Sequence, residues 1–318
     1  MSENAQVNNS ESYGWIPDEK DPNDSKTSDP AVQSLLAAEG YHIRVQSDEL
    51  SFDVQPEELP VSVDLRQWAS LARDQGKINS CTAHATSAML EYIQRRKYKR
   101  EINGSRLFVY KASRNLLQWT GDKGANLRTA MKSLVLFGMP PENYWPYDPA
   151  KIDDEPPAFC YAFGIRYAAT AYVRLDPDGV DVEEVIKSIK RYLVDGLPSV
   201  CGFKIFFSAN MQAAENGGKY PVPNDYDIQN GAHAVAIFGY DDSLIIQNTS
   251  SSGAVSSTGA FLFQNSRGPE WGDKGFGWLP YDYLRKDLSS DWWTLIDSSW
   301  TDLESFQAQT NRDKSTTK

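Results

Sequence analysis

The order of apolar and polar positions divides the chain into a helical half and a strand half. After Ser80, apolar side chains recur at helical spacing, so that Ala85, Met89 and Tyr92 share one face. A basic stretch at residues 95–97 follows, and cations at this end suit the helix dipole. The same periodicity predicts three further helices, over residues 105–118, 125–137 and 180–195.

Downstream of these helices the pattern changes to short stretches rich in Val, Ile and Phe, which are typical of strands. The predicted strands are Ser199–Phe207, Ala232–Tyr240, Ser243–Asn248, Gly259–Asn265 and Phe276–Pro280. The Ser, Thr and Gly residues of Thr249–Thr258 predict a long hairpin loop. Helices followed by strands predict an α+β protein with two lobes, and a cleft between lobes is a common place for a site.

The first 59 residues differ in composition from the rest. They are rich in Asp, Glu, Ser, Asn and Pro, so we interpret residues 1–59 as a tail or pro-segment. Residues 60–300 form the predicted globular domain, and residues 301–318 a polar C-terminal tail. Val32–Glu39 predicts two helical turns, and Trp15 is the candidate anchor that would dock the tail. A disordered tail remains the alternative.

Composition excludes several classes of function. The 318 residues carry a net charge of −11, which repels phosphate and argues against nucleic-acid binding. Neither a long apolar run nor a secretory signal is found, so we expect no membrane span and a cytoplasmic location, with non-classical secretion left open. Clustered metal ligands, phosphate-binding glycine motifs and a GxSxG serine elbow are also missing, so we expect neither a metal nor another cofactor.

Cysteine and histidine residues are few, which narrows the candidates for chemistry. Cys81 opens the first predicted helix, where the positive end of the dipole would lower the pKa of its thiol and favour a nucleophilic thiolate. Gln75 lies six residues earlier and can bring its side-chain NH₂ to the same spot. A small buried core residue is the alternative interpretation of Cys81, and simple packing is the interpretation of Cys160 and Cys201.

Three stretches together resemble the papain-like cysteine peptidases. Residues 74–85 (DQGKINSCTAHA) resemble the nucleophile region of that family, residues 231–240 its His strand, and residues 263–268 its Asn strand. The order Cys, His, Asn is also the family's order. The tail and the SCTA stretch are most similar to bacterial, xylellain-like members. The resemblance implies a two-lobed α+β fold, with a helical left lobe, an antiparallel β right lobe and the active site in the cleft between them.

The resemblance also implies a role for each matching residue. Catalytic roles would fall to Cys81 as the nucleophile, His233 as general base and acid, Asn265 as the group that orients the imidazole, and Gln75 as an oxyanion donor. Substrate-binding positions would be Gly124, Ala125 and Trp271. An ion pair of His233 with Cys81 would keep the thiolate populated.

Some positions depart from the family pattern. Ala125 stands where a second Gly is common, and Arg267 replaces the usual Trp after Asn-Ser. His84 is expected to be a core histidine, and it is the fallback base if His233 has another role.

These inferences predict a cysteine-type peptidase that acts on peptides or proteins through an acyl-enzyme. Two alternatives stay open: an acyl-transfer enzyme (transamidase, ligase or cyclase) on the same scaffold, and a catalytically inactive peptide-binding relative. The tail is a candidate self-inhibitor that crosses the cleft. Deletion of residues 1–55 is therefore expected to raise peptidase activity.

Overall fold

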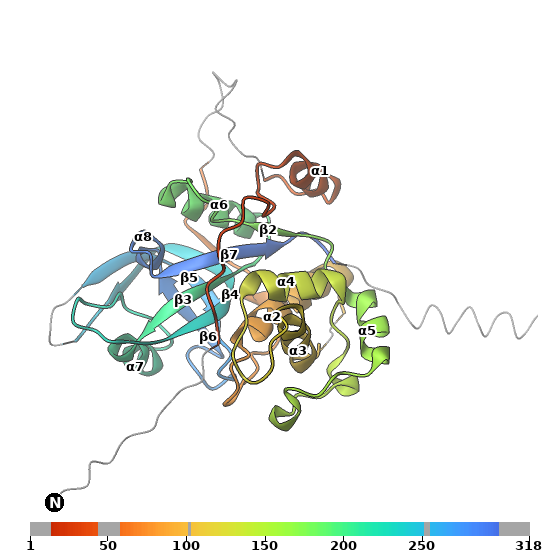
Figure 1. The fold of residues 1–318 in the computed structure, drawn as a ribbon. Coiled ribbons are helices and arrows are strands. Elements are labelled where there is room, and N and C mark those ends of the chain that lie inside the picture. The colour runs from red at the N-terminus through yellow and green to blue at the C-terminus, as the bar shows by residue number, and fades with distance from the viewer. Residues whose placement is uncertain (1–13, 44–57, 101–102, 251–254, 299–318) are drawn as a thin grey trace, which may run out of the picture.

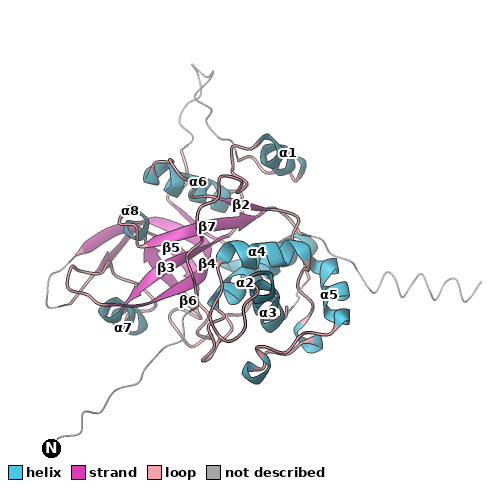
Figure 2. Ribbon diagram, in the orientation of Figure 1, coloured by secondary structure: helices cyan, strands magenta, loops and turns pink. Residues whose placement is uncertain are grey.

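A computed structural model describes residues 14–43, 58–100, 103–250 and 255–298. One group of helices lies on one side and an antiparallel sheet, with further helices around it, lies on the other, so the described chain has two lobes (Figures 1 and 2). This arrangement confirms the predicted two-lobed α+β fold. None of the helices in the described ranges is long and apolar enough to cross a membrane.

The helical lobe is built around α2, whose first three turns are almost wholly buried. Asn126 caps α4 by accepting a hydrogen bond from the Thr129 amide, and Ser105 caps α3 by accepting one from the Phe108 amide. The helices of this lobe are α2 (Cys81–Tyr98), α3 (Arg106–Leu116), α4 (Leu127–Leu136) and α5 (Ala158–Gly164).

The sheet has the strand order β2-β7-β3-β4-β5-β6, and β1 adds to it by pairing with β4. Its strands are β1 (Ser62–Asp64), β2 (Tyr172–Arg174), β3 (Ser199–Phe206), β4 (Gln229–Gln247), β5 (Ser256–Gln264), β6 (Phe276–Pro280) and β7 (Ser289–Leu295). Every pairing between them is antiparallel. Figure 1 also shows α6 (Val182–Val194), α7 (Phe207–Glu215) and α8 (Asp282–Arg285) around this sheet.

Two groups of buried apolar side chains form the core. One joins the helical lobe to one face of the sheet, and the other includes the apolar side chains of α6 and of the opposite face of the sheet. Val32, Leu36 and Ile43 belong to the second group, so α1 (Pro30–Ala38) and the residues just after it contribute to the core of the fold. The helix predicted over Val32–Glu39 is confirmed, slightly earlier in the chain.

Several sequence predictions need correction. Ser243–Asn248 is not a separate strand, because β4 runs on to Gln247 through an irregularity between Asp241 and Ile245. The hairpin loop is shorter than predicted, since β5 already begins at Ser256. The stretch around Cys160, for which no helix was predicted, forms α5 directly after Pro157, whose fixed φ suits a helix start.

Other elements were not predicted. They are β1, β2, β7, α7 and α8. Polar residues interrupt the apolar pattern of β7, which contains Ser289, Ser290 and Asp291. The predicted C-terminal tail, 301–318, lies outside the described residues.

Candidate active site

Cys81 is the first residue of α2 and is fully buried. The amides of Thr82, in the same helical turn, and of Ala234, on β4, act on its sulfur as hydrogen-bond donors. Because Ala234 directly follows His233, the nucleophile candidate of the helical lobe lies beside the histidine strand of the sheet. Residues about 150 positions apart in the sequence therefore meet at the boundary between the two lobes.

His233 lies on β4 and pairs with Asn265 just after the end of β5. The His233 Nε2 and Asn265 Oδ1 atoms are 2.8 Å apart, and both residues are buried. The same Oδ1 accepts a hydrogen bond from the Ser266 amide at 2.8 Å. Since a carbonyl oxygen only accepts, the proton of the neutral ring belongs on Nε2, which leaves the Nδ1 lone pair as the proton acceptor.

The Gln75 side chain is held on both of its polar atoms. Its Oε1 accepts a hydrogen bond from Ser266 Oγ at 2.5 Å, and its Nε2 donates to the Ile78 carbonyl at 2.9 Å. Ser266 therefore connects Gln75 to the His233–Asn265 pair. Ser266 lies within the Asn motif at residues 263–268, but the sequence alone did not indicate this role.

Burial controls the protonation of both candidate groups. It raises the pKa of the Cys81 thiol to about 12, against the smaller opposing effect of the Ala234 and Thr82 amides. It also lowers the pKa of His233 to about 3, and the Arg267 charge acts in the same direction. The lowered thiol pKa expected from the helix dipole is thus wrong in this structure, because desolvation outweighs the dipole. Both shifts favour the neutral forms of the two groups.

Trp271 lies beside the His–Asn pair, as the resemblance implies. Its ring packs near those of Phe263 and Tyr220, with centroids 5.8 and 6.3 Å away. A small cavity of about 80 Å³ opens there, and it is lined by His233, Asn265, Arg267, Trp271, Asn210, Ala214 and Tyr220.

Gly124 and Ala125 lie against residues 14–16 of the same chain, and Ala125 is hydrogen-bonded to them. The Ala125 amide donates to the Gly14 carbonyl at 2.9 Å, and the Ile16 amide donates to the Ala125 carbonyl at 3.1 Å. The Gly14 amide is 3.4 Å from the carbonyl of Ala232, next to His233. A carbon added at Gly124 would lie 2.2 Å from the Gly14 oxygen, so the glycine permits this close approach.

We call residues 14–29 the N-terminal segment. In Figure 1 it runs in red from α1 across the boundary between the sheet and the helical lobe. Trp15 is only 5% exposed and forms a parallel bridge with Ala125, so its predicted role as an anchor agrees with its position.

Comparison with known families identifies the fold. Residues 59–285 match the family described as "Papain family cysteine protease". The chain belongs to this family. Among curated papain-family relatives, an uncharacterized peptidase C1-like protein of Acanthamoeba polyphaga mimivirus is 29% identical over 260 residues, covering 79% of each chain.

Solved papain-family structures agree with the described architecture. Xylellain, a cysteine protease from Xylella fastidiosa, matches with a TM-score of 0.68 and 28% identity, over 92% of this chain and 97% of that one. The digestive procathepsin L 3 of Tenebrio molitor larval midgut matches with a TM-score of 0.56 and 18% identity, over 83% of this chain and 78% of that one. The protein is therefore a cysteine peptidase of the papain-like fold.

The other candidate residues lie outside this constellation. His84 is buried, its Nδ1 is 3.0 Å from the Ser80 carbonyl, and burial lowers its pKa to about 3. It packs edge-on against the Tyr147 ring, as a core histidine would. Cys160 and Cys201 are buried free thiols, and burial raises the pKa of each.

Replacement of Asn265 by Ala should lower kcat about 100-fold, because the imidazole loses the partner that fixes its orientation. Steady-state peptide hydrolysis measures this effect in a chain whose cleft is unblocked by the Trp15→Ala substitution. Asn248→Ala is the matched control, since it removes another fully buried Asn that bonds to the Val222 carbonyl. A kcat unchanged by Asn265→Ala would show that the 2.8 Å contact has no role in catalysis.

Proposed function

We propose that this papain-family protein hydrolyses peptide bonds through Cys81 and His233, and that its own N-terminal segment blocks the site. The observation that carries the catalytic part is the joint placement of Cys81 against Ala234 and of His233 against Asn265. A nucleophile, a base and an orienting group meet there from α2, β4 and the end of β5.

The steps follow from these positions. Cys81 Sγ bonds to the substrate carbonyl carbon while its proton passes to His233 Nδ1. The oxyanion accepts hydrogen bonds from the Cys81 amide and from Gln75 Nε2, which Ser266 and Ile78 hold in place. His233 then gives the proton to the leaving amine as the C–N bond breaks. Water finally attacks the thioester carbon while His233 takes its proton. The C–S bond breaks, the acid leaves, and His233 returns the proton to Cys81 Sγ.

Direct occupation of a binding edge supports the inhibitory part of the proposal. The segment uses the Ala125 amide and carbonyl and approaches the Ala232 carbonyl, all of which a substrate backbone would need. Related solved structures include pro-forms, among them the Tenebrio procathepsin. With the segment in place, Cys81 and His233 are both buried.

Product analysis tests the reaction type. A chain with an unblocked cleft is incubated with a mixture of peptides, with and without an added primary amine, and the products are identified by mass spectrometry. Free carboxylic acids as the main products support hydrolysis. Products that carry the added amine would instead show acyl transfer.

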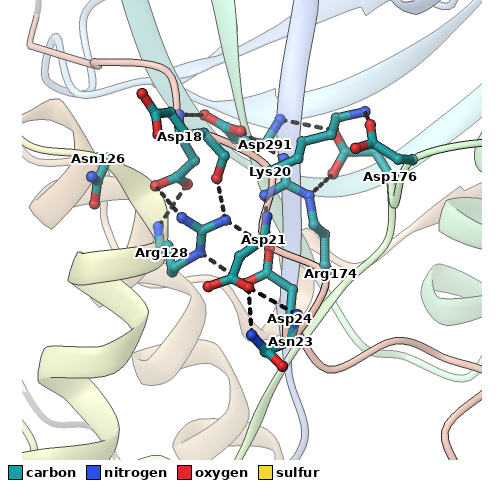
Figure 3. A network of polar contacts seen from close by, with 12 residues as sticks. Asp18, Lys20, Asp21, Asn23, Asp24, Asn126, Arg128, Arg174, Asp176 and Asp291 are labelled. Atoms are coloured by element: carbon teal, nitrogen blue, oxygen red, sulfur yellow. Dashed lines mark hydrogen bonds and ion pairs between the residues drawn. The ribbon is translucent and has the colours of Figure 1, made fainter.

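Charged side chains fasten the N-terminal segment to the domain (Figure 3). Asp24 forms ion pairs with Arg128 on α4 at 2.7 Å and with Arg174 on β2 at 3.2 Å. The Asp18 amide donates to Asp291 Oδ2 on β7 at 2.8 Å, and Asp18 Oδ2 accepts from the Arg128 amide at 2.9 Å. We call these five residues the latch.

One carboxyl of the latch is placed to hold a proton. Burial, and then the nearby Asp291 charge, raise the pKa of Asp18 to about 7, against the opposing charges of Arg128 and Arg174. Asp18 Oδ1 is buried and accepts no hydrogen bond among the described residues, but it lies 3.7 Å from Arg128 Nη1. Protonation of Asp18 therefore gives up this long ion pair and relieves the repulsion from Asp291. The docked segment thus binds a proton that a released, solvated Asp18, with a pKa near 3.8, gives up.

The sign of the pH dependence follows. Docking is strongest at low pH, weakens as the pH rises from about 4 to 7, and is fully weakened above the docked pKa. Protection of Cys81 by the docked segment is measured as a ratio of alkylation rates. The rate in the full-length Trp15→Ala chain is divided by the rate in the parent chain. The titration of the thiol itself affects both rates and therefore cancels. From pH 5 to 8 this ratio should fall about tenfold to a hundredfold.

Asp18→Asn is the matched control for this titration, because it mimics the protonated carboxyl. Its protection ratio should stay nearly constant over the same pH range. A parent ratio that is flat or that increases with pH would contradict the role given to Asp18.

A further inference from the structure

The Trp15 side chain fills a recess that exists because residue 202 is Gly. A carbon added at Gly202 would lie 1.9 Å from Cε2 and 2.2 Å from Cδ2 of the indole. Gly202 lies on β3, paired with Ala234 of β4 on one side and with Ser290 of β7 on the other. Any larger residue at 202 would therefore occupy the space that the flat ring takes.

A hydrogen-bond acceptor lies at the far end of this recess. Trp15 Nε1 donates to Asp291 Oδ2 at 2.9 Å, and this contact is buried. The pairing of β3 with β7 shifts register between Val200 and Gly202, and Asp291 lies in this bulge with a φ of +57°. The regular pairing of β3 with β7 is therefore interrupted at Asp291, whose carboxylate binds the indole N–H.

Neighbouring charges decide which donor the recess accepts. Arg174 Nη2 already donates to Asp291 Oδ1 at 2.8 Å, so the carboxylate is neutralised by a guanidinium. A second guanidinium, that of Arg128, lies 5.6 Å from the Trp293 ring centroid, and Arg174 lies 4.8 Å from the same ring. An incoming Lys or Arg would meet these two cations, and an acidic side chain would meet Asp291. A neutral, flat group with an N–H donor suits the recess best.

The recess lies next to the catalytic groups. Gly14, the residue before Trp15, brings its amide toward the Ala232 carbonyl beside His233. Gly14 and Ile16 both bond to Ala125, so Trp15 lies at the centre of the paired stretch. A side chain in the recess thus belongs to a residue very close to the reacting bond.

We infer that this recess, with Gly202 as its opening and Asp291 as its floor, is a substrate subsite that selects tryptophan. The inference rests on the proposed peptidase function, and it makes Gly202 and Asp291 specificity-determining residues. The N-terminal segment blocks the enzyme by placing its own Trp in the position meant for the substrate's.

The test uses the full-length chain with Trp15→Ala, which empties the recess. A single Trp is moved along otherwise small and polar peptides, and the cleavage sites are mapped by mass spectrometry. Cuts should fall at a constant distance from the Trp. Replacement of that Trp by 1-methyltryptophan, which keeps the ring and loses the N–H, should lower kcat/KM about tenfold. Leu, Arg or Glu in place of the peptide's Trp should lower kcat/KM further.

Two variants connect this preference to the recess. Asp291→Asn keeps a carbonyl acceptor and should largely keep the preference for Trp over 1-methyltryptophan, whereas Asp291→Ala should remove it. Gly202→Ala should shift the preference from Trp toward smaller side chains. The peptide comparison needs neither variant, so it decides the question even if one of them does not fold.

The two proposals fail in different ways. Cleavage that ignores the Trp position, or equal cleavage of Trp and 1-methyltryptophan peptides, would overturn the subsite and leave the peptidase intact. If no peptide is cut, the peptidase proposal fails, and calorimetric binding of the same two peptides to the same chain still tests the recess. Equal affinities would then overturn the subsite, and about tenfold tighter binding of the Trp peptide would support it.

Discussion

Cys81→Ala is expected to abolish peptide hydrolysis, lowering kcat by about 10⁴-fold to 10⁶-fold in a chain with an unblocked cleft. The reason is that Cys81 is the group proposed to form the acyl bond. The remaining thiols, Cys160 and Cys201, are buried, and burial raises the pKa of each. Residual activity would come only from the oxyanion donors and from substrate binding. Steady-state hydrolysis of a fluorogenic peptide measures the loss.

Cys201→Ala provides the matched control, since it removes a buried thiol of the same size from β3. It should retain the parent kcat. A Cys81→Ala chain that still turns over substrate within tenfold of its parent would rule out the thiol mechanism. In that case the family's catalytic positions would not carry the reaction in this protein.

Deletion of residues 2–17 should raise peptide hydrolysis at least about 100-fold over the full-length chain. Removal of a buried Trp costs about 3–5 kcal/mol, and the hydrogen bonds to Ala125 are lost with it. This deletion is shorter than residues 1–55, because Val32, Leu36 and Ile43 belong to the core. Their removal would expose apolar surface and destabilise the fold, so a change in the rate of hydrolysis could no longer be assigned to the cleft alone.

Two full-length variants separate the effect of the side chain from that of the backbone. Trp15→Ala should activate strongly, whereas Ile16→Ala keeps the backbone hydrogen bond to the Ala125 carbonyl and should stay mostly blocked. Equal turnover of the full-length chain and the shortened chain would refute self-inhibition. The comparison uses initial rates at pH 5, where the latch is expected to hold most firmly.

The candidate site residues came from the resemblance to papain-like peptidases. Cys81, His233, Asn265 and Gln75 do gather at the boundary between the lobes, and local signals such as the Asn126 cap explain why the helices are found near their predicted ranges. Local patterns succeed here because helix periodicity and caps depend on neighbouring residues only.

Tertiary effects account for what the sequence could not predict. Asp291 was missed because it lies in a strand that polar residues interrupt, and its importance depends on a bulge and on Trp15 from the opposite end of the chain. The raised pKa of Cys81 was missed for a similar reason. The helix dipole can be inferred from the position of Cys81 at a helix start, but burial depends on how distant segments pack.

The proposed thiol mechanism and its self-inhibition are tested most directly by the rate at which limiting iodoacetamide modifies Cys81, followed site by site with mass spectrometry. We expect fast modification of Cys81 alone in the chain lacking residues 2–17, slow modification in the full-length chain, and loss of the fast reaction after His233→Ala. Equal rates in the full-length and shortened chains, or a Cys81 no more reactive than an ordinary thiol in the shortened one, would contradict this proposal.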